Sequence, residues 1–229
     1  METIEKLRRQ AEEYLALARE EMEQAKALAT VAKSEVNKAK AIEKLSEKKV
    51  ELAKIQKELA EKTRKLVERK IKLKNEGVIE FLEEELKREQ ASAIHDEKIA
   101  EIQELIAKIN EDIAEAEVDI GKEKTNLAKE KMDGAKEREK MGKLTQVYTK
   151  ALENHQAAQQ GGIAEKIHKA QEKVKDAREN YTDQIKKLEE KQKDVSKKQQ
   201  KVWDKENKLA DLRQKYADKI SELEKIRHG

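Results

Sequence analysis

Nine apolar residues in the last third of the chain recur at steps of seven without a break. They are Ile167, Val174, Tyr181, Leu188, Val195, Val202, Leu209, Tyr216 and Leu223. A seven-residue apolar repeat of this length is typical of a helix that supercoils around a partner helix. The repeat therefore predicts a coiled-coil helix and argues against disorder, in spite of the polar composition.

The composition of the whole chain also favours long helices. The 229 residues include no proline, the one residue that cannot donate the helical N–H, so nothing forbids a helix from continuing. Charged residues make up 44% and aromatic residues 3%, which suits a thin, elongated core better than a thick one. We expect an all-α protein.

Two glycine sites divide the chain into three segments, of about 1–76, 78–160 and 163–228. The first site is Gly77 and the second is the pair Gly161 and Gly162. Lysines precede Gly77 and glutamates follow it, as the charges at helix ends favour. We expect a reversal at both sites, and hence one domain, residues 1–229, built as an elongated antiparallel coiled coil of three long helices.

Charge supports the first reversal. In a hairpin centred on the first glycine, the numbers of facing residues sum to about 154, so that Lys70 faces Glu84 and Arg69 faces Glu85. A basic run then lies against an acidic run. Since exposed ion pairs contribute little stability, we expect these charges to select the register.

The size of the side chains supports the same reversal. Alanines that recur between residues 11 and 39 would face the glycine-bearing stretch 115–143, so small residues would face small residues. Leucines follow at steps of seven, and we expect them to fill a wider gap in the seam: Leu45, Leu52, Leu59, Leu66 and Leu73.

The second reversal would place residues with numbers summing to about 323 opposite one another. One seam of the third segment then becomes polar at Gln192, Gln199 and Glu206, and the middle segment has a similar polar stretch at 121–142. We expect a second copy to cover such lapses, so the chain is predicted to self-associate. The first two segments would also project as a two-helix tip around Gly77, whose apolar residues could bind a partner: Leu66, Ile71, Val78, Phe81 and Leu82.

A lysine-rich stretch in the third segment could contact an anionic surface such as lipid headgroups. The candidate residues are Lys186, Lys187, Lys197, Lys198 and Lys201. Solvation of an outer helix face is the commoner explanation for such a run.

The four histidines form two pairs in the second hairpin register, His155 with His168 and His95 with His228. Facing imidazoles could bind a transition metal. Because two ligands make an incomplete site, coincidence is the favoured explanation, and no metal or cofactor is predicted.

Several functions are disfavoured by the sequence. With no cysteine, the chain has no disulfide and no thiol catalysis. A formal net charge of +3 is not that of a dedicated nucleic-acid binder, so no nucleic-acid partner is expected. The chain carries no glycine-rich phosphate loop, nucleophile elbow or metalloprotease motif, so we expect no enzyme. It also has no signal peptide or membrane span, so we expect a cytoplasmic protein. Peripheral association with a membrane is the alternative location.

These features predict a non-enzymatic coiled-coil scaffold or assembly protein that forms an elongated homodimer or filament. An alternative comes from a resemblance: three helices of these lengths are similar to the crescent-shaped BAR domains, in helix number and length across the whole chain. That resemblance implies a dimer that presses a lysine-lined face on curved membrane. BAR helices are commonly kinked, often with the help of proline, whereas here only Gly121, Gly134 and Gly142 could bend a helix. A long-hairpin component of a toxin or secretion apparatus is a further alternative.

Overall fold

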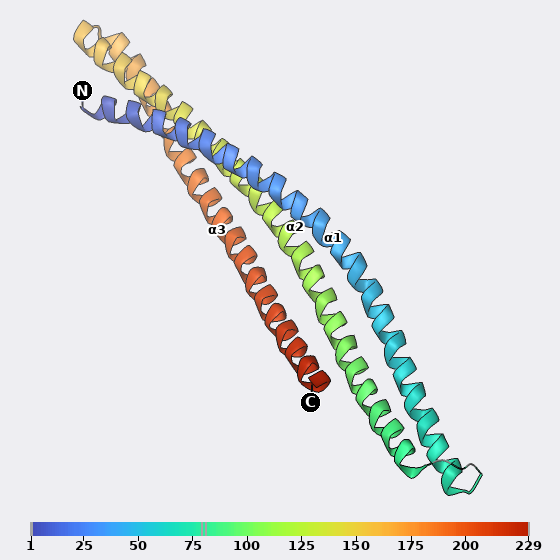
Figure 1. Ribbon diagram of the computed structural model, residues 1–229. Coiled ribbons are helices and arrows are strands. Elements are labelled where there is room, and N and C mark those ends of the chain that lie inside the picture. Colours follow the sequence, from blue (N-terminus) through green and yellow to red (C-terminus); the bar gives the residue numbers. More distant parts are fainter. Residues whose placement is uncertain (1, 79, 81, 229) are drawn as a thin grey trace. The chain divides into compact units, whose positions relative to one another are not determined.

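The structure, a computed structural model, describes residues 2–78, 80 and 82–228, and no strand occurs among them. Three helices follow one another: α1 (Glu2–Asn75), α2 (Glu83–Gly161) and α3 (Ala164–His228) (Figure 1). The prediction of three long helices is confirmed. Five of the six predicted helix ends agree to about one residue, whereas α2 begins at Glu83 instead of residue 78.

Glycine stands just after the helix at both reversals. Gly77 has a φ of 72°, its N–H donates to the Lys74 carbonyl over 2.9 Å, and the Val78 N–H donates to the Leu73 carbonyl, also over 2.9 Å. This pair of bonds forms a Schellman cap at the end of α1. Gly162 follows α2 with a φ of 67°. A residue with a side chain adopts this left-handed region only at a cost of about 1–2 kcal/mol, which explains glycine at both positions.

The chain divides into two compact units. Unit 1 contains Met1–Ser34 and Gly121–Trp203, and unit 2 contains Glu35–Ile120 and Asp204–Gly229. All three helices contribute residues to each unit, so neither unit is a single stretch of the chain.

In unit 1, α1 and α2 approach closely through small residues. A Cβ atom on Gly142 would lie 2.8 Å from Leu15 Cγ and 3.1 Å from the Ala11 carbonyl oxygen, so only a hydrogen atom fits there. The helices are antiparallel, since Arg8 near the start of α1 pairs with Glu153 near the end of α2 at 2.6 Å. The small residues buried in this unit come from both helices: Ala11, Ala18, Ala25, Ala32, Ala128 and Ala135. Small residues thus face small residues, as the sequence predicts.

The polar seam between α2 and α3 in unit 1 is closed by side chains of the chain itself. Gln192 and Gln199 are exposed, and the seam continues at Gln184 and Lys191 instead, seven and fourteen residues after Ala177. Gln184 Nε2 donates to the Glu137 carboxylate over 2.8 Å, and Lys191 Nζ donates to the Glu130 carboxylate over 3.3 Å. The polar lapse therefore does not need a second copy to cover it, which corrects the reason given above for self-association.

In unit 2, ion pairs fix the register of α1 against α2. Lys70 Nζ lies 3.0 Å from Glu89 Oε2, and Arg64 Nε lies 2.9 Å from Glu97 Oε2. Basic residues of α1 do face acidic residues of α2, but the expected pairing of Lys70 with Glu84 is wrong by about five residues. The reason is the connection: it extends to Leu82, so the centre of the hairpin lies beyond Gly77.

A carboxylate that is nearly buried in unit 2 joins the same two helices. Glu104 accepts a bond from Lys108 Nζ at 2.6 Å on its own helix and lies 3.1 Å from Lys57 Nζ on α1. The hydrogen bond from Lys108, followed by that from Lys57, lowers the pKa of Glu104. The reciprocal bond to Glu104 raises the pKa of Lys57. The pair stays ionised at neutral pH and links α1 to α2.

The last part of α3 packs on α2 in unit 2. Lys205 Nζ lies 3.2 Å from Asp119 Oδ2, and Arg213 pairs with Glu117 at 2.8 Å. Leu209 and Leu223 are buried, as the seven-residue repeat predicts. Because α3 ends at His228, the α1–α2 hairpin of this unit continues past the end of α3 (Figure 1).

Candidate interaction surfaces

The most prominent apolar surface of unit 2 is a row of leucines on α1. Leu45, Leu52, Leu59 and Leu66, here called the leucine row, are 56% to 65% exposed. Successive residues of a helix point about 100° apart, and the residues buried against the rest of the unit stand one position later in the heptad: Ser46, Ala53 and Val67. The expectation that these leucines fill the α1–α2 seam is therefore wrong.

The sequence itself distinguishes the exposed leucine row from the buried row that stands one position later. Serine, alanine and valine also recur at steps of seven, directly after the leucines, and they give a seam narrow enough for close packing. The prediction assigned the larger side chains to the seam and therefore placed the seam on the wrong face of α1. Large residues can occupy the outer row because they have no neighbour to fit there.

Basic residues flank the leucine row on both sides. The residues three and four positions after each leucine are its neighbours on the helix surface. Between residues 48 and 70 these positions include no acidic residue and five basic ones: Lys48, Lys49, Lys62, Arg69 and Lys70. The first four are exposed and make no ion pair with other described residues, whereas Lys70 pairs with Glu89.

The predicted tip residues lie at or near the end of the same hairpin. Leu66 belongs to the leucine row, Val78 and Leu82 are exposed in the connection, and Ile71 is half-buried. Phe81 lies outside the described residues. Three of the four described tip residues thus add exposed apolar area to unit 2.

A smaller row with acidic flanks occurs on α1 in unit 1. Leu17 and Val31 are 45% and 54% exposed and occupy the heptad position that the leucine row occupies further along the helix. The neighbours of Leu17 on the helix surface include Glu13 and Glu20, both exposed, and Glu21. We call Leu17 and Val31, with these three glutamates, the acid-flanked row.

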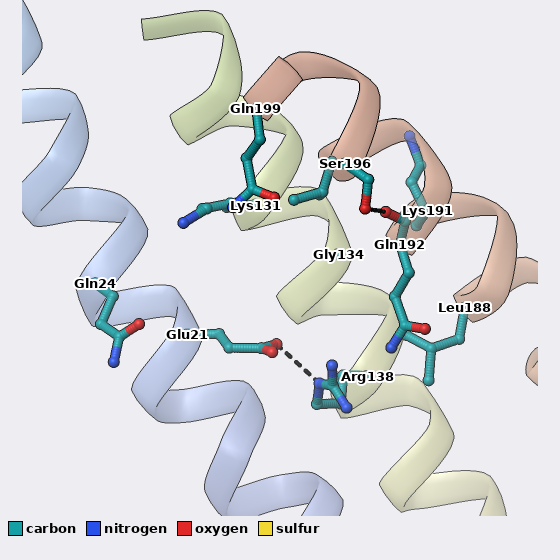
Figure 2. Close-up of a pocket in the computed structure, with 11 residues that line it drawn as sticks. Glu21, Gln24, Lys131, Gly134, Arg138, Leu188, Lys191, Gln192, Ser196 and Gln199 are labelled. Carbon is teal, nitrogen blue, oxygen red and sulfur yellow. Dashed lines mark hydrogen bonds and ion pairs between the residues drawn. The ribbon is translucent and has the colours of Figure 1, made fainter. Parts of the chain in front are cut away.

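Unit 1 also contains a polar groove of about 470 Å³ between its three helical segments (Figure 2). Glu21 enters it from α1 and accepts a 2.8 Å bond from Arg138 Nε on α2, and Gly134 leaves space on the same helix. On the α3 side, the Ser196 hydroxyl donates to the carbonyl of Gln192 over 3.0 Å. Ligand pockets are mostly apolar and enclosed, and this open groove of amide and charged groups suits water better.

The lysines predicted for an anionic surface are placed on α3 in unit 1. Lys186 and Lys197 are exposed and lie 3.6 Å and 3.8 Å from Asp183 and Asp194 on their own helix. Lys187 and Lys201 are exposed as well, whereas Lys198 is half-buried. Local carboxylates thus partly neutralise this face.

The histidine pairs gain no further ligand. Among the described residues, no group of three or more His, Asp or Glu side chains could hold a metal ion. His168 lies 3.8 Å from Glu172 on its own helix. The expectation that neither pair, His155 with His168 nor His95 with His228, binds a metal stays a prediction.

No helix in the described part of the chain has a stretch apolar and long enough to cross a membrane. No family model matches the chain, and no curated protein matches it. A solved structure, the EFC/F-BAR domain of Drosophila Syndapin/PACSIN, is similar over 89% of this chain and 77% of that one, with 16% identity and a TM-score of 0.32. At this level the similarity carries no inference about function.

Proposed function

We propose that the chain is a non-enzymatic helical scaffold that self-associates through the leucine row of unit 2. The observation that supports this is the exposure of four leucines at steps of seven on one helix. Soluble proteins rarely leave a contiguous apolar surface of this kind uncovered unless it binds something. A seven-residue spacing is the one that suits a second helix.

The exposed area sets the strength of the contact. Complete burial of a leucine side chain contributes about 1.5–3 kcal/mol. Since about three fifths of each leucine in the row is exposed, covering all four would contribute about 4–7 kcal/mol. Loss of translational and rotational freedom costs about 4–15 kcal/mol. The row alone gives weak association, so flanking charges and other contacts have to add to it.

Sedimentation equilibrium between about 10 and 300 µM tests the proposal, because weak dimers dissociate in this range. The wild-type chain is expected to exceed the monomer mass as the concentration rises. The double variant Leu52→Gln, Leu59→Gln is expected to need at least about ten times more protein to associate. Both residues are exposed and glutamine is a good helix former, so the fold should persist.

A matched control carries two substitutions on another side of α1 in the same unit, Glu47→Gln and Lys54→Gln. Both residues are exposed, and this variant is expected to associate like the wild type. A wild-type chain that stays monomeric over the whole range would refute self-association. Equal association of the leucine variant and the control would show that another surface is used.

Peripheral membrane binding is the second candidate function. The observation that favours it is the exposed lysines of α3, with the basic flanks of the leucine row as further cations, since cations beside apolar side chains suit an anionic lipid surface. Co-sedimentation with vesicles of anionic lipid at low and at physiological salt tests this. Binding that survives physiological salt and falls on charge reversal of Lys186, Lys197 and Lys201 would support it, and absence of binding at both salt concentrations would exclude it.

A further inference from the structure

We infer that the leucine row of one copy binds the acid-flanked row of a second copy, and not a second leucine row. This inference rests on the proposed self-association and specifies which two surfaces meet. The occupant of the leucine row would be the stretch of α1 around residues 13–31 of the second copy.

Charge disfavours the simplest alternative, two leucine rows face to face. An antiparallel pair of leucine rows that matches Leu45 with Leu66 and Leu52 with Leu59 places Lys49 opposite Lys62. No acidic residue occupies the flanking positions of either helix. Like charges opposite each other weaken a contact, and in specific interfaces such juxtapositions exclude the wrong partner.

The acid-flanked row has the complementary sign. Glu13 and Glu20 are exposed on the same side of α1 as Leu17, and neither is engaged by a basic residue of another helix. When Leu17 is matched with Leu66 of an antiparallel second copy, Val31 meets Leu52 and Glu20 comes next to Lys62. Two of the four leucines then meet an apolar residue, whereas Leu59 comes opposite Gln24 and Leu45 opposite Lys38. The acidic flanks of Leu17 meet the basic flanks of Leu66.

The spacing of the two rows agrees as well. Leu17, Val31 and the leucine row all occupy one heptad position of α1, separated by whole numbers of heptads, with Gln24 and Lys38 at the intervening positions. An antiparallel alignment can therefore match both rows in a single register.

The test uses charge reversal and mixing. The acid-reversed variant carries Glu13→Lys and Glu20→Lys, and the base-reversed variant carries Lys62→Glu and Arg69→Glu. In each variant alone, the substituted positions around Leu66 then carry the same sign as those around Leu17, while Lys48, Lys49 and Lys70 are left unchanged. We expect each to associate at least about tenfold more weakly than the wild type at low salt. In an equimolar mixture the rows are complementary again, and association is expected to return to within about threefold of the wild type, as mixed dimers.

Two controls and a salt series complete the design. Glu12→Lys with Glu47→Lys, and Lys40→Glu with Lys54→Glu, make the same changes in net charge at exposed positions of α1 away from both rows. These variants are expected to associate like the wild type. At about 1 M salt, where charges are screened beyond about 3 Å, the reversed variants should approach the wild type.

The outcomes separate the two proposals. If the leucine variant loses association while the acid-reversed variant keeps it, self-association through the leucine row stands and the acid-flanked row is not its occupant. Stronger association of the base-reversed variant alone would show that two leucine rows meet. A wild-type chain that is monomeric but binds anionic vesicles, less so after Leu52→Gln and Leu59→Gln, would refute both proposals in favour of a lipid surface.

Discussion

Two glycines of α2, replaced by alanine one at a time, give a sharp test of the close approach in unit 1. Alanine is favoured over glycine inside a helix by about 1 kcal/mol, and this gain applies at both positions. At Gly134 the added Cβ would meet only Val195 Cγ2, at 4.0 Å, an ordinary contact. Gly134→Ala is therefore expected to stabilise unit 1 by about 0.5–1 kcal/mol.

At Gly142 the added Cβ meets the neighbouring helix. Leu15 Cγ and Cδ2 would lie 2.8 Å and 2.9 Å away, and the Ala11 carbonyl oxygen 3.1 Å away. Cγ is the branch point of the leucine and the carbonyl belongs to the backbone, so neither can move aside freely. Overpacking of this kind costs about 1–3 kcal/mol, so the net effect of Gly142→Ala after the helical gain is a loss of up to about 2 kcal/mol.

The assay is urea unfolding followed by far-UV circular dichroism for the wild type and both variants. Since the chain has two compact units, hydrogen exchange of amides near Ala11 should be measured as well, so that the change is assigned to unit 1. The difference in free energy of unfolding between Gly134→Ala and Gly142→Ala is expected to be about 1–3 kcal/mol. Equal stabilisation by both substitutions would refute the close approach of α1 to Gly142.

Three further predictions concern a turn, a buried carboxylate and the histidines. Gly162→Ala should destabilise the chain by about 1–2 kcal/mol because Gly162 has a φ of 67°, whereas Gly161→Ala should be close to neutral; thermal unfolding compares them. Glu104→Gln should cost about 1–2 kcal/mol at neutral pH. Because its two lysine partners hold the pKa of Glu104 below its ordinary value of 4.5, the stability it contributes is present above that pH and is lost on further acidification, so acid unfolding of the variant should be less steep. Zinc should leave the melting temperature unchanged, since the described histidines have no third ligand, and a rise that disappears after His→Ala substitution would contradict this.

Much of the fold is encoded in periodicity and could be predicted. The apolar row of α3 and the glycine reversals gave the helix number, the order and most of the helix ends. The register of the first hairpin was not predictable to the residue, because Val78 and Leu82 follow the glycine in a connection that a helical pattern does not mark. Such a connection moves every facing pair by several residues while it leaves the complementary charge runs in contact.

The interaction surface could be found in part. The seven-residue spacing of the leucines is plain in the sequence. Such a spacing predicts that another helix packs on that face of α1, but it does not identify the helix. α3 contacts α2 through Asp119 and Glu117. Which helix α3 packs against depends on the relative packing energies of all the apolar rows of the three helices, and no single row reveals it. The polar residues at the α2–α3 seam were similarly misjudged, because Gln184 and Lys191 fill it with hydrogen bonds that hydrophobicity does not reveal.

The period of the leucine row also favours a helix over a flat surface as its occupant. On a straight α-helix, steps of seven drift by about 20° per heptad, so from Leu45 to Leu66 the row turns by about 60° over about 32 Å. A flat bilayer would meet leucines at one end of such a row and basic flanks at the other. A second helix can wind with the row and cover all four leucines. Since Ser46, Ala53 and Val67 advance in the same steps, the row also keeps a fixed angle to the buried seam of its own helix, as a site for a further helix of a bundle requires.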